Sequence, residues 1–206
     1  MKIGNITISE GNDKIGNTPN VSLLPIITCP ECTECKKDCY ALKFARMYPG
    51  VLAAWADNTL EYYKSLGSYF LAITTYLREK KPKYFRWHVG GDIPDMLYFI
   101  AMIAVARVYS NTRFLAYTKN TETVSARLRS EATSPLPKNL SIIVSRWKGD
   151  KEDPALTKGL PQAWVHDPSD PDTRIPKRAI KCKGTCMDCR VCWNLKPGQS
   201  VVFEKH

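Results

Sequence analysis

The stretch Tyr84-Phe85-Arg86-Trp87-His88-Val89-Gly90-Gly91-Asp92 marks the point where the chain changes from helical to alternating strand and helix patterning. Its aromatic and branched residues, 84–89, predict a β-strand that the glycine pair ends. Asp92 is expected to cap the following helix, with Pro94 near its first turn. One face of that helix combines the apolar residues Leu97, Ile100, Ala101, Ala104, Val105 and Val108. Phe99, Met102 and Ile103 make the helix apolar almost all round, so we expect it to be well buried.

The same alternation continues on the C-terminal side. Further strands are predicted over 113–117, 140–145 and 162–165, with a helix over 121–130. On the N-terminal side, helices are predicted over 40–47, 50–66 and 68–80, preceded by an extended arm over 1–28. Strand–helix alternation favours parallel pairing with right-handed crossovers, but there are too few units for an eight-stranded barrel of about 250 residues. We therefore predict a single α/β domain, 1–206, built as an open or partial parallel (β/α) barrel.

Polar side chains stand where the predicted strands end, which is where parallel α/β folds bind ligands. Alternation along the first strand places Arg86 and His88 on one face, pointing into the barrel or cleft. The candidate cofactor-binding residues are Arg86, His88, Gly90, Gly91, Asp92, Tyr117 and Lys119. The alternative is structural: an Arg86–Asp92 ion pair, His88 bonded to backbone, and a glycine pair that only makes a turn. No catalytic residue is assigned.

All eight cysteines lie in two short segments, called here the N-terminal and C-terminal knots. The N-terminal knot, 29–39, contains Cys29, Cys32, Cys35 and Cys39; the C-terminal knot, 182–192, contains Cys182, Cys186, Cys189 and Cys192. A disulfide scaffold is typical of small secreted domains, whereas this chain is long enough to bury a core without one. We therefore predict that all eight cysteines bind metal and that the metal brings the two knots together.

The spacing favours an iron–sulfur cluster over zinc. Gaps of two, two and three residues suit a short loop that wraps several corners of one cubane, so one or two [4Fe–4S] clusters are expected. Zinc sites use Cys-x2-Cys pairs separated by a spacer, and zinc remains the alternative metal. In two-cluster ferredoxins one run lends its last cysteine to the other cluster, so Cys39 is also a candidate partner of Cys182, Cys186 and Cys189.

The formal net charge of +10 favours nucleic acid or another polyanion as a partner, although solubility explains it equally well. The longest apolar run, 96–106, is too short to span a bilayer, so no membrane association is expected. No sequence feature identifies a protein partner.

Three stretches of the chain resemble the gene product 88 family of bacteriophage proteins. They are Val21-Ser22-Leu23-Leu24-Pro25 with Thr28-Cys29-Pro30 and Cys39-Tyr40-Ala41; Arg86 to Asp92 with Phe114-Leu115-Ala116-Tyr117-Thr118; and the C-terminal knot closing with Cys192-Trp193. The resemblance implies a phage or prophage origin and no established reaction. Together with the absence of a signal-peptide core at the N-terminus, it leads us to expect a protein of the bacterial host cytoplasm.

The chain is also similar, more weakly, to radical S-adenosylmethionine enzymes, which have a partial barrel, a Cys-x3-Cys-x2-Cys loop and a glycine motif after a strand. Cys182, Cys186 and Cys189 have that spacing, and Gly90-Gly91-Asp92 is similar to the glycine motif. The loop comes late in the chain, Asp188 precedes its third cysteine, and a fourth cysteine is present, all unlike that family. The expected function is an iron–sulfur protein with redox or radical chemistry at the strand ends, with S-adenosylmethionine a candidate cofactor. The alternatives are a metal-stapled nucleic-acid-binding protein and an electron-transfer or structural module.

Overall fold

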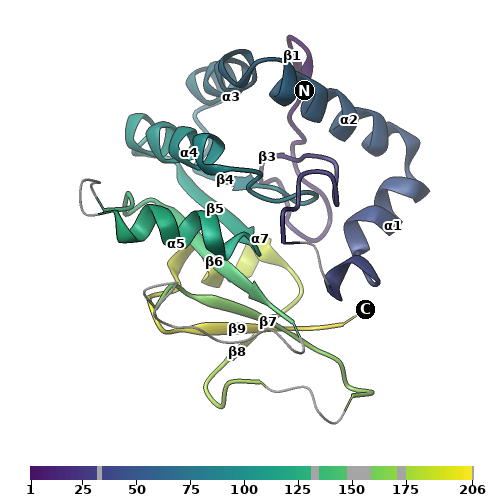
Figure 1. The fold of residues 1–206 in the computed structure, drawn as a ribbon, viewed down its shortest axis with the longest axis vertical. Helices are drawn as coiled ribbons and strands as arrows, with labels where there is room; N and C mark the ends of the chain where they lie inside the picture. The colour runs from purple at the N-terminus through teal and green to yellow at the C-terminus, as the bar shows by residue number, and fades with distance from the viewer. Residues whose placement is uncertain (32–33, 131–134, 148–158, 171–174, 206) are drawn as a thin grey trace.

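A parallel sheet of seven strands forms the centre of the computed structural model, which describes residues 1–31, 34–130, 135–147, 159–170 and 175–205 (Figure 1). The strands are β3 (Asn20–Val21), β4 (Tyr84–Trp87), β5 (Arg113–Thr118), β6 (Leu140–Arg146), β7 (Gln162–His166), β8 (Ile180–Lys181) and β9 (Ser200–Glu204). Their order is β3-β4-β5-β6-β7-β9-β8, with every neighbouring pair parallel. In the described part of the chain β3 and β8 are the sheet edges, so the sheet is open.

The helices precede or connect these strands. They are α1 (Tyr40–Met47), α2 (Pro49–Lys64), α3 (Leu66–Lys80), α4 (Met96–Val108), α5 (Thr121–Arg129) and the single turn α7 (Cys186–Cys189), with 3-10 turns η1 (Glu34–Lys36) and η2 (Val191–Asn194). The predicted single α/β domain with parallel pairing is therefore confirmed, whereas the curvature of a partial barrel stays a prediction. None of the helices in the described residues is both long and apolar enough to cross a membrane.

The sheet separates two apolar layers because its side chains alternate between the two faces. Phe85, Trp87 and Phe114 pack on one face against helices α3 and α4, in the main core. Leu115 and Ile143 point to the opposite face, which we call the inner face. The C-terminal knot covers the inner face, since Cys192 and Trp193 belong to the same apolar cluster. Helices thus cover one side of the sheet and cysteines the other.

The N-terminal arm is more ordered than an extended segment. Residues 2–3 (β1, Lys2–Ile3) and 6–7 (β2, Ile6–Thr7) form a small antiparallel pair. Asn58 of α2 holds this pair, because its side chain bonds both the N–H and the carbonyl of Thr7, at 2.7 and 3.0 Å. The arm then adds β3 to the sheet beside β4, with Asn20 opposite Arg86.

Three predictions about β4 and the segment after it are wrong. The strand ends at Trp87 rather than at residue 89, and Asp95, not Asp92, caps α4 by accepting a bond from the N–H of Tyr98 at 2.8 Å. The expectation that α4 is buried almost all round is also wrong, because Leu97 and Val108 are 66% and 74% exposed. The buried residues are Tyr98, Phe99, Met102, Ile103, Val105 and Ala106. A helix that is apolar all round has no periodicity that could select the correct face.

Candidate metal centre

The C-terminal knot places Cys182, Cys186 and Cys192 against the inner face of the sheet. Cys182 follows β8 and its N–H donates to Val202 O at 2.9 Å, which fixes the start of the knot on β9. Arg190, with φ of 49°, separates the single turn α7 from η2 and so folds the chain back sharply. Cys186 interacts electrostatically with Cys182 and Cys189, and Cys192 with all three of the others. The four thiols therefore form one electrostatic group.

Burial makes two of these thiols, Cys186 and Cys192, hard to ionise in the absence of a counter-charge. Burial is the main reason that the pKa of Cys186 is raised and that the pKa of Cys192 is raised to about 11, with the other thiols adding to both shifts. A metal ion reverses this preference because it stabilises the deprotonated thiolate directly. The chemistry of the site therefore suits a metal better than it suits free thiolates.

Arg86 and Tyr117 project from the inner face toward the C-terminal knot. The Tyr117 side chain is hydrogen-bonded to Cys192, and the guanidinium carbon of Arg86 lies 5.1 Å from the centre of the Tyr117 ring. Arg86 also lies close enough to Cys186 to favour its thiolate. Arg86 Nε is buried and has no hydrogen-bond partner among the described residues. A cation with a spare donor thus stands beside the gathered thiols.

The N-terminal knot approaches the same arginine through Tyr40, the first residue of α1. The Tyr40 hydroxyl donates to Val89 O at 2.6 Å, at the end of the β4 segment. Burial of this hydroxyl raises its pKa, and Arg86, Cys39 and Cys29 are its charged or ionisable neighbours. Arg86 is therefore a neighbour both of Cys186 in the C-terminal knot and of Tyr40, whose other neighbours are Cys29 and Cys39.

Contacts between the chain ends hold this arrangement without any metal. The N–H of Cys186 donates to Lys14 O at 2.9 Å, and Arg190 donates to Thr18 Oγ1 at 2.8 Å. The Arg190 guanidinium also lies 4.4 Å from the Tyr84 ring and 5.2 Å from the Trp193 ring. The N-terminal arm is therefore attached to the C-terminal knot by protein contacts alone.

The donor set has the right chemistry but not a closed coordination shell. None of the seven described cysteines forms a disulfide, and Cys32 lies outside the described residues. Within the described ranges no group of three Cys, His, Asp or Glu side chains stands in a position to hold a metal ion. Metal binding by either knot, and a metal joining both knots, therefore remain predictions.

His88 does not share a face with Arg86, which corrects the alternation prediction. With φ of 55° at His88 the chain leaves the strand pattern, and Nε2 lies 2.9 Å from the Tyr98 hydroxyl in the helix-covered core. The Tyr98 hydroxyl is also bonded to that of Tyr69, at 3.0 Å. Burial, with a smaller contribution from Arg86, lowers the pKa of His88 to about 3, so the ring is neutral at physiological pH.

Asp92 organises the ends of the strands rather than pairing with Arg86. Its carboxylate accepts from the N–H of Ile93 at 2.6 Å and from the N–H of Lys119 at 2.7 Å, and it also bonds Thr118. Burial raises the pKa of Asp92 to about 6 despite these bonds, and nearby Glu31 adds to the shift. Asp92 thus ties the segment after β4 to the end of β5, where Lys119 lies 5.6 Å from the Trp147 ring.

The glycine pair is in contact with protein rather than with open space. A Cβ on Gly90 would overlap the Trp55 ring, lying 2.6 Å from Cη2, and one on Gly91 would lie 2.7 Å from Thr28 Oγ1. Gly91 also has φ of 81°, in the left-handed region. Both glycines are therefore needed for close packing against α2 and against the segment that leads into Cys29.

The family model for Gene product 88 matches residues 4–195, which include both knots, the glycine pair and the whole sheet except β9. The chain belongs to the gene product 88 family. No curated protein and no solved structure matches the chain. The resemblance seen in the sequence is thereby confirmed for this family, whereas nothing supports the similarity to radical S-adenosylmethionine enzymes.

Sequence reasoning missed two residues of the candidate centre of this gene product 88 protein. Tyr40 and Arg190 each lie next to a cysteine, directly after Cys39 and directly after Cys189. That adjacency is the only signal in the sequence for either residue. It does not show that the Tyr40 hydroxyl reaches Val89, or that Arg190 lies against two aromatic rings, because both contacts depend on the tertiary fold.

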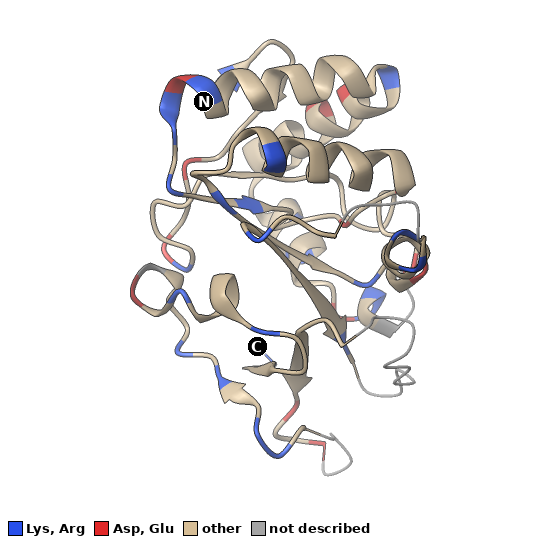
Figure 2. Ribbon diagram, turned by 90° about the vertical axis from the view of Figure 1, so that its left-hand side faces the viewer, with Lys and Arg blue, Asp and Glu red and all other residues tan. Residues whose placement is uncertain are grey.

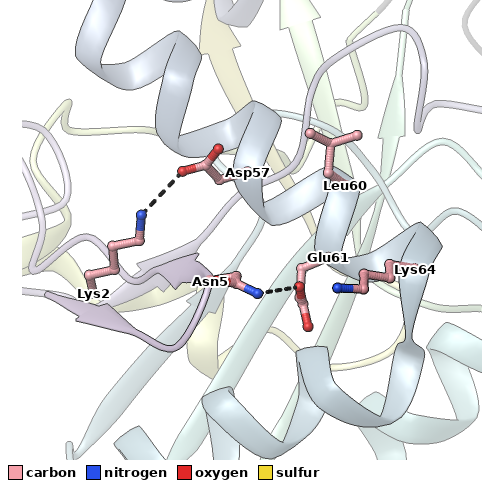
Figure 3. Close-up of a pocket in the computed structure, with 6 residues that line it drawn as sticks. All are labelled: Lys2, Asn5, Asp57, Leu60, Glu61 and Lys64. Carbon is pink, nitrogen blue, oxygen red and sulfur yellow. Dashed lines mark hydrogen bonds and ion pairs between the residues drawn. The ribbon is translucent and has the colours of Figure 1, made fainter.

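A surface pocket of the gene product 88 protein lies away from this centre. It is lined by Lys2, Asn5, Asp57, Leu60, Glu61 and Lys64, between the β1–β2 turn and α2 (Figure 3). An ion pair of 3.5 Å between Lys2 and Asp57 and a hydrogen bond of 3.0 Å between Asn5 and Glu61 cross it. These exposed polar links join the N-terminal arm to α2. None of the predicted cofactor-binding residues lines this pocket, so it does not extend the candidate site.

Proposed function

We propose that this gene product 88 protein binds an iron–sulfur cluster through Cys182, Cys186, Cys189 and Cys192, on the inner face of the sheet. The observation that supports this most is the electrostatic grouping of these four thiols beside Arg86 and Tyr117. A cubane offers four iron corners to four thiolates of one short loop, which the spacing of the C-terminal knot suits. The small movement that closes the thiols around the cluster accompanies binding, since metal sites commonly form together with their metal.

The surroundings of the thiols suit an anionic cluster. Four thiolates around an iron–sulfur core carry net negative charge, and the Arg86 guanidinium offers a positive charge and a free Nε donor next to Cys186. The Tyr117 hydroxyl can donate to the Cys192 sulfur. Hydrogen bonds to cluster sulfurs and burial both set the reduction potential of such centres. Bound in this position, the cluster would supply one-electron transfer.

The N-terminal knot is proposed as a second ligand set. Cys29 and Cys39 approach the Tyr40 hydroxyl, which neighbours Arg86 in turn, so a second cluster there would share the same cation. A single cluster held by Cys39 together with Cys182, Cys186 and Cys189 would instead staple the two ends of the domain. Iron content separates these arrangements, because two cubanes hold about eight iron atoms and one holds about four.

The same features support electron transfer or structural stapling rather than radical catalysis. Four thiolates would occupy every iron of a cubane and leave none open for S-adenosylmethionine. The glycine pair is closed off by Trp55, Leu23 and Thr28, so it offers no space for a methionine group. We therefore expect that S-adenosylmethionine leaves the electron paramagnetic resonance signal of the reduced protein unchanged. A perturbed signal together with 5′-deoxyadenosine formation would instead establish the radical enzyme.

The test compares two variants of the C-terminal knot after anaerobic purification and reconstitution. Cys186→Ser removes a proposed ligand, whereas Thr185→Ala changes the adjacent residue, whose side chain makes no capping hydrogen bond. We expect wild type and Thr185→Ala to hold equal iron and acid-labile sulfide, and Cys186→Ser to lose most of both. Stoichiometric zinc without acid-labile sulfide in wild type would contradict the proposal, and so would full iron retention in Cys186→Ser.

A further inference from the structure

Helix α1 packs with its small residues inward and its large apolar residues outward. Ala41 and Ala45 are 4% and 0% exposed, and they pack with Trp55 of α2. The solvent-exposed part of the helix and its C-cap carries Tyr40, Phe44, Met47 and Tyr48, which are 61%, 38%, 69% and 48% exposed. Spacings of four, seven and eight residues place these four side chains on one face of the helix. This face, called here the α1 face, lies at the edge of the molecule near the C-terminus (Figure 1).

The aromatic rings of the α1 face are held in place. The Tyr40 hydroxyl is bonded to Val89 O at 2.6 Å, so its exposed area lies mainly on the ring. The Phe44 and Tyr48 ring centres lie 4.5 Å apart, which makes them one aromatic surface. Rings that are already fixed lose little conformational entropy when a flat partner stacks on them.

Positive charge is concentrated in the sequence around these rings. Residues 36–48 contain Lys36, Lys37, Lys43 and Arg46 but a single acidic residue, Asp38. Asp38 lies 3.9 Å from Lys43 Nζ and 3.0 Å from Lys205 Nζ, so two cations share this one carboxylate beside the helix. A second copy of the chain would bring two such positive sets together and is therefore disfavoured by charge.

We propose that the α1 face binds single-stranded nucleic acid, with bases stacked on Tyr40, Phe44 and Tyr48 and phosphates beside Lys43 and Arg46. Exposed aromatic rings interleaved with cations are what sequence-tolerant single-strand binding requires, since every base has a π-face and every nucleotide a phosphate. A duplex hides its bases and would gain only the charge contacts. The proposal rests on α1 and does not depend on which metal the knots bind.

Lysine and arginine are spread over many elements of the chain in the ribbon of Figure 2. The α1 face combines cations and exposed rings within one short segment, residues 40–48. The net charge of +10 then contributes long-range attraction, while the α1 face supplies the contact.

The experiment measures anisotropy of a fluorescein-labelled 15-nucleotide oligothymidine with the metal-loaded full chain. Phe44→Ala should weaken binding about tenfold, and Leu97→Ala, which removes an equally apolar and exposed residue of α4, should leave it unchanged. Lys43→Ala should reduce the slope of log affinity against log salt by about 0.7. Circular dichroism checks that each variant is folded.

Equal affinities for Phe44→Ala and Leu97→Ala would overturn the proposal. The same applies if a duplex of equal length binds as tightly as the single strand. A third contradicting result has two parts. Wild type would show no affinity for the oligonucleotide but would bind anionic vesicles or dimerise, and Phe44→Ala would lose that vesicle binding or dimerisation. In that case the α1 face would serve an anionic lipid surface or a second copy of the chain.

Discussion

Three glycine-to-alanine variants separate backbone strain from close packing at the glycine pair. Gly4 has φ of 57° and open space around its Cβ position, so Gly4→Ala costs backbone strain alone, about 1 kcal/mol. Gly90 lacks a left-handed φ but abuts the Trp55 ring, so Gly90→Ala costs overpacking alone, about 1–3 kcal/mol. Gly91 has φ of 81° and a Cβ position only 2.9 Å from Leu23 Cβ and 2.7 Å from Thr28 Oγ1. We expect Gly91→Ala to combine both costs, about 2–4 kcal/mol.

Urea denaturation, monitored by tryptophan fluorescence at equal metal loading, measures the three free energies of unfolding. The structural account predicts the largest loss for Gly91→Ala and the smallest for Gly4→Ala. It also predicts that Gly91→Ala weakens metal retention, because Thr28 directly precedes Cys29. If Gly91→Ala were no less stable than Gly4→Ala, the packing of the 23–28 segment on the glycine pair would be wrong. A variant with unchanged stability but impaired ligand binding would show instead that the pair serves close approach by a ligand.

Three further variants test the core and the attachment of the arm. Tyr98→Phe leaves His88 Nε2 and the Tyr69 hydroxyl without their shared partner, so it should lower the free energy of unfolding by about 1–3 kcal/mol in thermal or urea unfolding. The control, Tyr63→Phe, changes a tyrosine that is 59% exposed and should cost under about 0.5 kcal/mol. The folded pKa of His88, about 3, lies below its ordinary value of 6.5, so the unfolded chain binds the extra proton and stability is lost as pH falls below about 6.5. The His88→Asn variant lacks this titrating group, so its free energy of unfolding does not show that loss. The difference in stability between wild type and His88→Asn should therefore shrink by up to about 1.4 kcal/mol per pH unit as pH falls from about 6.5 to about 4. A difference that does not change with pH would show that His88 titrates normally. Arg190→Met removes the guanidinium that contacts two aromatic rings and donates to Thr18. It should lower the free energy of unfolding by about 1–2 kcal/mol and speed proteolysis of the N-terminal arm. Unchanged proteolysis would mean that other contacts hold the arm.

The repeating pattern of the chain predicts most of the fold. The helix over 40–47 was predicted with the bounds that α1 has, and the strands over 113–117, 140–145 and 162–165 each differ from the structure by one residue at the C-terminal end. Strand β9 was missed, because Ser200–Glu204 is short and follows a glycine turn with no helix before it to indicate a crossover. Its place between β7 and β8 depends on pairing that local sequence does not encode.

The candidate site was predictable only where strict alternation holds. Arg86 lies within β4 and faces away from the helix-covered core, as period-two patterning predicts. His88 lies one residue past the end of the strand, and its left-handed φ sends the ring into the helix-covered core instead. The glycine pair was ambiguous for a related reason, because the sequence shows that a close approach is needed but not which group makes it. Trp55 and Thr28 fill those positions in the fold.

Anomalous diffraction at the iron absorption edge, from crystals grown anaerobically, tests the central claim most directly. We predict a strong iron peak on the inner face of the sheet, enclosed by the sulfurs of Cys182, Cys186, Cys189 and Cys192 and adjacent to the Arg86 guanidinium. A second peak beside Cys29 and Cys39 would show that the N-terminal knot holds its own cluster. A peak that appears at the zinc edge alone, or no metal peak within reach of the C-terminal knot, would contradict the account.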